Sequence, residues 1–414
     1  MSWHKVKLKT LLSQPVQNGY SPVCPEEPNG KWVLGLGALS GSGLDSTQIK
    51  PAPVDDSKVD NFLLRPGDFL VSRSNTRDKV GRSALFKGEI KNCSYPDLMM
   101  RFRINETTIY PEFLEMYLRS HRTVKYFQRS ASGTSGTMVK INKRVVENLK
   151  VPLPPMPEQT AIADLLSTWD AAIEKTEKLI AAKEKRFLWL RAQLLTPEAD
   201  WKHLKLTTVC SIKKGQQLSK VDMIESGRYY VLNGGISPSG YTDKWNTPEN
   251  TITISEGGNS CGFVSFNKEP FWSGGHCYSL IKLSRDINPF FLYHFLKCNE
   301  HKIMRLRVGS GLPNIQRKDI ENIHISFPKS LQQRQISEAL NTAFQEIEIL
   351  CDMVKAFHRQ KRGLMQKLLT GQWRAPSHPP PPPSFPRKRE SREQGTMIDQ
   401  YDCHTTLDAG SRPA

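Results

Sequence analysis

The chain contains an internal repeat, and this repeat limits its possible folds more than any other sequence feature. Residues 141–196 correspond to residues 315–370 at a constant offset of 174, without a gap. Identical residues recur along the match, including Glu147-Asn148 on Glu321-Asn322, Ile173-Glu174 on Ile347-Glu348, and Leu194–Thr196 on Leu368–Thr370. The repeat predicts a molecule built from two copies of one structural unit.

Each copy ends in a heptad pattern. Mainly apolar residues recur at alternating steps of four and three from Ile162 to Leu194, and again from Ile336 to Leu368. This spacing is the a/d seam of a coiled coil and predicts two helices of roughly 38 residues, each about 57 Å long. Polar residues interrupt the seam at Thr176, Lys183 and Lys361.

We expect the two helices to pack on each other as an antiparallel pair, because a whole globular segment separates them along the chain. The alternative is that each helix packs only on its own domain. Prolines mark the helix starts, since proline suits the first turn of a helix and not its interior. They are Pro152, Pro154, Pro155 and Pro157 before the first helix, and Pro328 before the second. Thr196-Pro197 and Gly371 mark the ends.

The segments before the helices also match, more weakly, and they mix short strand and short helix patterns. Strands are predicted at 69–72, 251–255, 262–266 and 278–283, and helices at 111–120 and 289–297. The predicted class is α+β, with two mixed α/β domains joined by two long antiparallel coiled-coil helices. The predicted parts are a first domain (1–155), a helix (156–197), a second domain (198–330), a second helix (331–373) and a proline-rich disordered tail (374–414).

The net charge of +17 indicates a polyanionic partner. Acidic and basic residues balance from Ala375 to Ala414, so the whole excess lies in residues 1–374. The eight cysteines form no CxxC pair, which argues against a metal or redox site. No signal peptide and no 18-residue apolar run occur, so we expect a cytoplasmic protein.

Four motifs of nucleotide binding or catalysis are absent from the sequence or only weakly indicated by it. Gly30-Lys31 lacks the upstream glycine of a P-loop, and the glycines at 35–43 do not fit G-x-G-x-x-G. Neither asparagine nor aspartate precedes Pro154-Pro155, as the loop of adenine methyltransferases would require. Asp56-Ser57-Lys58 is an acidic-x-lysine triplet of the kind found in nucleases, but such triplets are common by chance.

A proline-rich segment followed by a long heptad helix occurs at 152–196 and again at 327–370. This doubled pattern resembles the specificity subunits of type I restriction-modification systems. Residues 310–323, just before the second helix, resemble them too. The resemblance covers nearly all of residues 1–373. The first copy has the fuller pattern, with prolines followed by Glu-Gln, at Pro154–Gln159. The second copy departs from it and has Ser326-Phe327-Pro328-Lys329 and Gln332-Gln333 instead.

The resemblance implies two target-recognition domains, each reading one half of a bipartite, asymmetric site in double-stranded DNA. The paired helices would act as a ruler and as a docking surface for two methyltransferase subunits, and two restriction subunits would complete the complex. The chain itself would be non-catalytic and bind no cofactor or metal. S-adenosylmethionine, ATP and Mg²⁺ would act in the partner subunits. Half-sites read from one face of the duplex lie about one helical turn apart.

Candidate DNA contacts lie in polar loops after strands or just before the helices. Arginine suits guanine, asparagine suits adenine, and glutamate can accept from cytosine. The candidates are Arg73, Asn75, Arg77, Lys79 and Arg82 in loop 72–82; Thr134 and Ser135 in loop 132–137; Glu256 and Asn259 in loop 255–260; and Ser310, Asn314, Gln316, Arg317 and Lys318 in loop 309–318. Each could instead be a solvated surface residue.

Two other functions remain open from the sequence. The chain could be a self-contained restriction-methylation enzyme, against which the missing methyltransferase loop and P-loop weigh. It could also be a scaffold whose coiled coil joins two interaction domains. The scaffold leaves the positive charge of residues 1–374 unexplained, because it needs no polyanionic partner.

Overall fold

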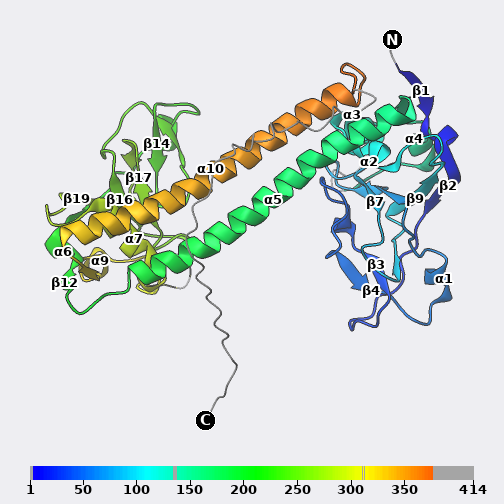
Figure 1. Cartoon of the computed structure of the whole chain (residues 1–414). Helices are drawn as coiled ribbons and strands as arrows, with labels where there is room; N and C mark the ends of the chain where they lie inside the picture. Colours follow the sequence, from blue (N-terminus) through cyan, green and yellow to red (C-terminus); the bar gives the residue numbers. More distant parts are fainter. Residues whose placement is uncertain (1–2, 134–137, 310, 312, 376–414) are drawn as a thin grey trace, which may run out of the picture.

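Two globular domains lie at opposite ends of a pair of long helices in the computed structural model (Figure 1). The structure describes residues 3–133, 138–309, 311 and 313–375. The predicted tail (374–414) lies outside the described residues from 376 onward, and its first two residues, Arg374 and Ala375, are described. Both domains mix helices and strands, so the predicted α+β class and two-domain architecture are confirmed.

The long helices are α5 (Met156–Leu194) and α10 (Ser330–Leu368), each of 39 residues. They run antiparallel: the ring of Trp169 lies 5.7 Å from that of Phe357, and Phe187 lies 5.7 Å from Phe344. Both helices end earlier than the predicted bounds of 197 and 373. The first stops before Pro197, and the second before Gly371, which adopts a φ of 74° that favours glycine.

The heptad seam faces the partner helix as predicted. Every seam position from Ile162 to Leu194 and from Ile336 to Leu368 is buried or half-buried. The two lysines that interrupt the seam have partners: Lys183 forms an ion pair of 2.6 Å with Glu346, and the buried ammonium of Lys361 pairs with Asp170. The seam therefore tolerates these lysines because each is neutralised across the helix pair.

The first domain is built around an antiparallel sheet of order β2-β9-β5-β7, with a smaller sheet, β4-β3-β8, beside it. Phe69 and Phe102 stack at 5.2 Å in its core. Its strands are β1 (His4–Lys7), β2 (Leu12–Asn18), β3 (Trp32–Leu34), β4 (Ile49–Pro51), β5 (Asp68–Ser72), β6 (Ser74–Asn75), β7 (Ser83–Phe86), β8 (Cys93–Ser94), β9 (Met99–Ile104), β10 (Val139–Lys140) and β11 (Lys150–Leu153). Its helices are α1 (Ser57–Asp60), α2 (Pro111–Arg119), α3 (His121–Ser130) and α4 (Lys143–Glu147).

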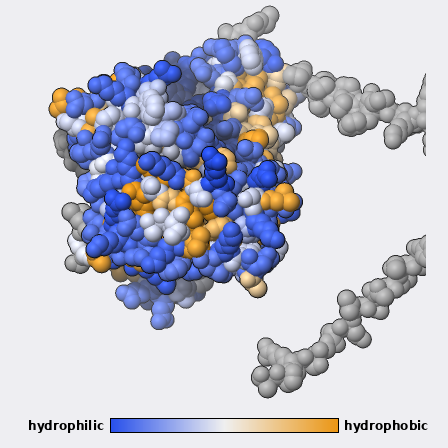
Figure 2. Space-filling view, turned by 90° about the vertical axis from the view of Figure 1, so that its left-hand side faces the viewer, coloured by the Kyte–Doolittle hydropathy of each residue, from blue (hydrophilic) through white to orange (hydrophobic). Residues whose placement is uncertain are grey.

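The second domain repeats this plan. Its main sheet has the order β13-β19-β16-β17, and its smaller sheet the order β15-β14-β18. Its strands are β12 (Lys202–Lys205), β13 (Ser211–Lys214), β14 (Tyr229–Leu232), β15 (Gly240–Thr242), β16 (Thr251–Ser255), β17 (Val264–Asn267), β18 (Trp272–Ser273), β19 (Cys277–Ile281) and β20 (His324–Phe327). Its helices are α6 (Leu206–Val209), α7 (Pro289–Cys298), α8 (Glu300–Met304) and α9 (Arg317–Glu321). The face at this end of the molecule is largely hydrophilic, with hydrophobic residues gathered near its middle (Figure 2).

One buried glutamine fixes each domain to the start of its long helix. Gln159 accepts from the Tyr110 amide at 2.7 Å and donates to the Pro154 carbonyl at 2.9 Å. Its repeat mate Gln333 accepts from the Asn288 amide and donates to the Pro328 carbonyl, both at 2.9 Å. Each glutamine thus ties the loop before α2 or α7 to the start of the long helix.

The two ends of the described chain meet where the first domain adjoins the start of α5. Arg374 forms an ion pair of 2.6 Å with Glu158, and the Trp3 indole donates to the same carboxylate at 3.2 Å. Leu368 and Leu369, at the end of α10, belong to the core of the first domain. The second long helix therefore returns to the domain where the chain begins. None of the helices in the described ranges is long and apolar enough to span a membrane.

Candidate nucleic-acid interface

The two predicted loops of the first domain lie side by side. Strand β6, inside loop 72–82, pairs with β10, which follows loop 132–137. The Ile141 amide donates to the Arg73 carbonyl at 2.9 Å. Thr134 and Ser135 lie outside the described residues, and their DNA contacts stay predictions.

The second domain joins its two loops in the same way. The Ile315 amide donates to the Glu256 carbonyl at 2.9 Å, and the Gly258 amide to the Pro313 carbonyl at 3.0 Å. Ser310 lies outside the described residues. Because Ile141 and Ile315 are repeat mates, Arg73 and Glu256 occupy equivalent positions. A second pair of hydrogen bonds supports this equivalence. The Arg73 amide donates to the Leu98 carbonyl, and the Glu256 amide donates to the His276 carbonyl.

Most predicted residues of the first domain are accessible. The Arg73 guanidinium donates to the Asp97 carbonyl at 3.1 Å, and that of Arg77 to the Gln128 carbonyl at 3.4 Å. Lys79 is exposed, and Arg82 lies 4.0 Å from Asp78. These side chains leave donors for a ligand, because a guanidinium has five N–H groups.

Asn75 requires a correction. Its side chain is only 7% exposed, and its amide oxygen accepts from the Thr76 amide at 2.9 Å. It therefore shapes the turn after β6, and this geometry argues against the predicted contact with adenine. Asparagine commonly makes such local hydrogen bonds in turns.

Basic and amide side chains that the loop prediction missed surround Arg73. Asn18, Asn142, Lys143 and Arg144 line a surface hollow of about 380 Å³ together with it. Lys143 and Arg144, at the start of α4, are the repeat mates of the predicted Arg317 and Lys318. The offset of 174 was the signal that could have identified them.

Glu256 also requires a correction. Its carboxylate is 5% exposed and accepts from Lys214 Nζ at 2.5 Å and from the Tyr278 hydroxyl at 2.9 Å. Burial and this carboxylate raise the pKa of Tyr278, so the hydroxyl stays protonated and donates. A buried, paired carboxylate is not placed to accept from cytosine, and Lys214 is the accessible member of the pair.

The other predicted residues of the second domain lie at or near the surface. Asn259, Gln316 and Lys318 are exposed, and Arg317 Nε forms an ion pair of 2.7 Å with Glu321. The backbone of Asn314 exchanges two hydrogen bonds with Val308, which closes the loop before α9. Their contacts with DNA stay predictions.

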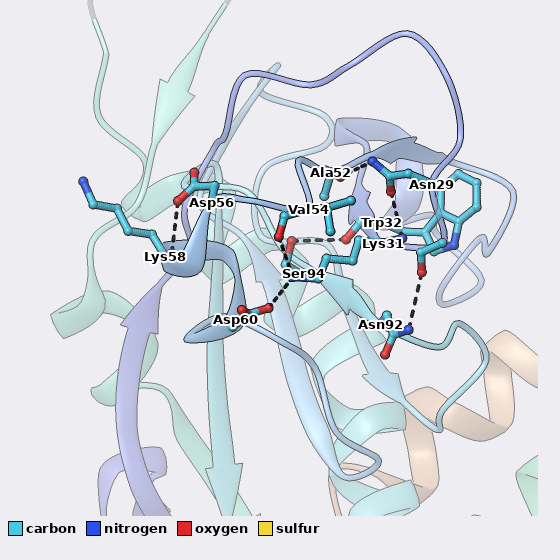
Figure 3. Close-up of polar contacts among 11 residues, drawn as sticks. Asn29, Lys31, Trp32, Ala52, Val54, Asp56, Lys58, Asp60, Asn92 and Ser94 are labelled. Atoms are coloured by element: carbon cyan, nitrogen blue, oxygen red, sulfur yellow. Dashed lines mark hydrogen bonds and ion pairs between the residues drawn. The ribbon is translucent and has the colours of Figure 1, made fainter.

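The acidic-x-lysine triplet at Asp56 has a structural explanation. The Asp56 carboxylate caps α1 by accepting from the Lys58 amide at 3.0 Å, and it also accepts from the Tyr20 hydroxyl at 2.9 Å. The Lys58 side chain extends away from that carboxylate (Figure 3). These contacts account for Asp56 without a catalytic role.

Comparison with known proteins agrees with the doubled architecture. Residues 53–184 and 198–351 match the family described as the type I restriction modification DNA specificity domain. A provisionally assigned type I specificity subunit of Mycoplasma pneumoniae is 34% identical over 178 residues, 42% of this chain and 47% of that protein. The match thus spans about half of that relative. A provisionally assigned specificity subunit of the MjaX type I restriction enzyme of Methanocaldococcus jannaschii is 24% identical over 407 residues, 90% of this chain and 94% of that one.

A solved structure has the same fold. The S subunit of a type I restriction-modification system from Mycoplasma genitalium aligns with a TM-score of 0.61 at 19% identity. The alignment covers 88% of this chain and 96% of the solved chain. At this identity the likeness concerns the fold and not individual contacts.

Proposed function

The chain belongs to the family of type I restriction-modification DNA specificity proteins, and we propose that it reads a split DNA sequence with one domain for each half-site. One observation supports this best. The position that holds Arg73 in the first domain holds Glu256, which is paired with Lys214, in the second. A repeated backbone with different polar side chains can read two different sequences, because base edges are distinguished by their hydrogen-bonding groups.

The helix pair supports a site with a fixed spacer. Each domain is tied to its long helix by Gln159 or Gln333, and the helices pack along their whole seam. The two reading surfaces therefore keep a set separation and orientation. This rigidity favours a non-specific spacer of constant length. Two domains that read one face of the duplex would place the half-sites about one helical turn apart.

The partners and cofactors form part of the same proposal. Two methyltransferase subunits would dock on the helix pair, and two restriction subunits would join them, in the cytoplasm where the DNA lies. Adenine methylation with S-adenosylmethionine, and cleavage with ATP and Mg²⁺, would be the chemistry of those subunits. This chain would contribute sequence recognition and no catalysis.

Methylome sequencing tests the proposal directly. A host expressing this chain with its methyltransferase is compared with the same host lacking this chain. We expect a split motif carrying N6-methyladenine that appears only when this chain is present. Absence of any new motif, with the partner present and folded, would contradict the proposal. Methylation by this chain alone would support the self-contained enzyme instead.

A binding measurement separates the reader from the scaffold. The affinity of the chain for duplex DNA should fall steeply with salt, because contacts with phosphates release counterions. The triple variant Arg73→Gln, Lys143→Gln and Arg144→Gln should weaken binding and flatten the salt dependence. The control Lys175→Gln, on an exposed face of α5, should bind like the wild type. An affinity for DNA that does not change with salt concentration would favour the scaffold function.

A further inference from the structure

We propose that Lys214 contacts DNA in the half-site bound by the second domain, and that Glu256 is the positioning residue that holds it there. The inference rests on the proposed function, because it assumes that this domain binds DNA. The ligand chemistry is an acceptor atom of the duplex, either a phosphate oxygen or the O6/N7 edge of guanine.

The ion pair between these residues is unequal in its exposure. Lys214 ends β13, Glu256 follows β16, and their Nζ and Oε1 atoms lie 2.5 Å apart. The carboxylate side chain is 5% exposed, whereas that of the lysine is 53% exposed. An ammonium has three N–H donors, and one of them is directed to Glu256. The pair therefore presents a fixed cation with donors left for a partner in solution.

Stability alone does not account for this arrangement. Burying a carboxylate is costly unless hydrogen bonds satisfy both of its oxygens. Within the described residues, Glu256 Oε2 has no hydrogen-bond partner, and Nδ1 of the exposed His276 lies 3.6 Å from it. An ion pair with one surface-exposed member adds little to folding. A carboxylate under such strain is better explained by what it holds in place.

The first domain presents a cation at the matching place by a different route. The strand pairing is equivalent in the two domains. Asn18, at the end of β2, lies opposite Met100 of β9, and Lys214, at the end of β13, lies opposite Tyr278 of β19. The position of Lys214 is thus taken by Asn18, and that of Glu256 by Arg73, whose guanidinium is held by the Asp97 carbonyl. The cation lies at the end of β13 in the second domain and after β5, the equivalent of β16, in the first, with one strand (β19 or β9) between these two positions. Both domains thus keep a fixed cation at this part of the sheet.

Basic neighbours accompany the cation in both domains. Helix α4 begins with Lys143 and Arg144, and α9 begins with Arg317 and Lys318. A cluster of cations beside a polar loop is the electrostatic footprint of a nucleic-acid contact. Arg73 lines one hollow with Lys143 and Arg144 in the first domain. In the second domain the charge of Arg317 acts on Tyr278, which donates to the same carboxylate as Lys214.

The test is the affinity of the full-length chain for two duplexes over a range of salt concentrations. One duplex contains the motif found by methylome sequencing, and the other a scrambled sequence. We expect Lys214→Gln to weaken binding. A phosphate contact predicts equal weakening on both duplexes and a salt slope reduced by about one. A guanine contact predicts roughly 5- to 150-fold weakening on the motif duplex alone. Either result supports the inference and identifies the acceptor.

Lys213→Gln is the matched control. Lys213 is exposed on the same strand and the substitution removes the same charge, but neighbouring residues of a strand point to opposite faces. We expect its binding to stay close to that of the wild type on both duplexes. Wild-type binding by Lys214→Gln at every salt concentration would overturn the inference. Because Lys214 lies at the surface, that variant should remain folded, as circular dichroism can verify.

The positioning role of Glu256 is tested by coupling. Glu256→Gln retains the size of the side chain and an acceptor for Tyr278 but loses the charge that holds Lys214. It should weaken binding in the same manner as Lys214→Gln, and the double variant should bind no worse than Lys214→Gln alone. Additive losses would overturn the positioning role. A wild-type chain without salt-dependent DNA binding would overturn the proposed function as well.

Discussion

The two ends of the helix pair share a backbone plan but differ in the side chains that face each other. Asp170 and Lys361 form an ion pair near the first domain. Their repeat mates, Phe344 and Phe187, form an aromatic pair near the second domain, with ring centroids 5.7 Å apart. The same two facing positions thus hold a charged pair at one end of the helices and an aromatic pair at the other.

This difference gives the helix pair a preference for its own partner. If two copies of α5 paired with each other, Asp170 would face Phe187. If two copies of α10 did so, Lys361 would face Phe344. Either pairing places a charged side chain against an aromatic ring without its ionic partner, which is costly for Lys361 because that residue is only 8% exposed. The unequal seam therefore favours α5 with α10 over identical pairs, as polar residues do in coiled coils.

The apolar end should be the more sensitive to truncation. Phe187 is buried between α10 and the second domain, where it contacts Phe344 and His294. Phe187→Ala should reduce the free energy of unfolding by about 3–5 kcal/mol, because it leaves a cavity. Urea unfolding followed by tryptophan fluorescence measures this. The adjacent, exposed Leu188→Ala should change stability by less than about 0.5 kcal/mol, and an equal loss there would contradict the assignment.

The charged end should show a smaller loss that can be rescued. Asp170→Ala leaves the Lys361 ammonium, in a residue 8% exposed, without its partner. We expect a loss of roughly 1–3 kcal/mol in the same assay. Adding Lys361→Met should recover most of it, since a buried pair can be replaced by apolar residues of similar volume. Failure of the second change to recover stability would show that the pair is not the cause.

The domains should also differ in their response to acid. Burial, opposed in part by a hydrogen bond to Asn341, lowers the pKa of His294 in α7, whereas the matching residue of α2 is Met116. The unfolded histidine gains a proton below about pH 6.5 while the folded one resists it, so the stability of the second domain falls as pH falls. Hydrogen exchange, corrected for intrinsic rates, should accelerate in α7 relative to α2 on acidification. His294→Met should abolish the difference.

The smallest effect is expected at the middle of the helix pair. Lys178 and Glu174 form an exposed ion pair of 2.5 Å within one helix face. Lys178→Ala should shift the urea midpoint by no more than replicate scatter, because solvent and salt screen such pairs. A clear shift would mean that this face is covered by something in the assay, such as a second chain.

The heptad pattern and the repeat predicted the long helices, their antiparallel pairing and the two domains, because these depend on periodicity and sequence order. The burial of Asn75 and Glu256 could not be predicted in this way. A loop sequence does not show that Lys214, on a distant strand, will pair with Glu256 beneath the surface. Lys143 and Arg144 were within reach, since the repeat maps them onto Arg317 and Lys318.

The return of α10 to the first domain has a mechanical consequence. Both helices connect the two domains, so a force that pulls the domains apart loads two struts in parallel. One strut, α5, is covalently continuous with a domain at each end. The other is continuous only with the second domain. The first domain holds its end through Leu368 and Leu369, and Arg374 pairs with Glu158 at the start of α5. Under load, this non-covalent joint should yield first, and the domains would then hinge about α5.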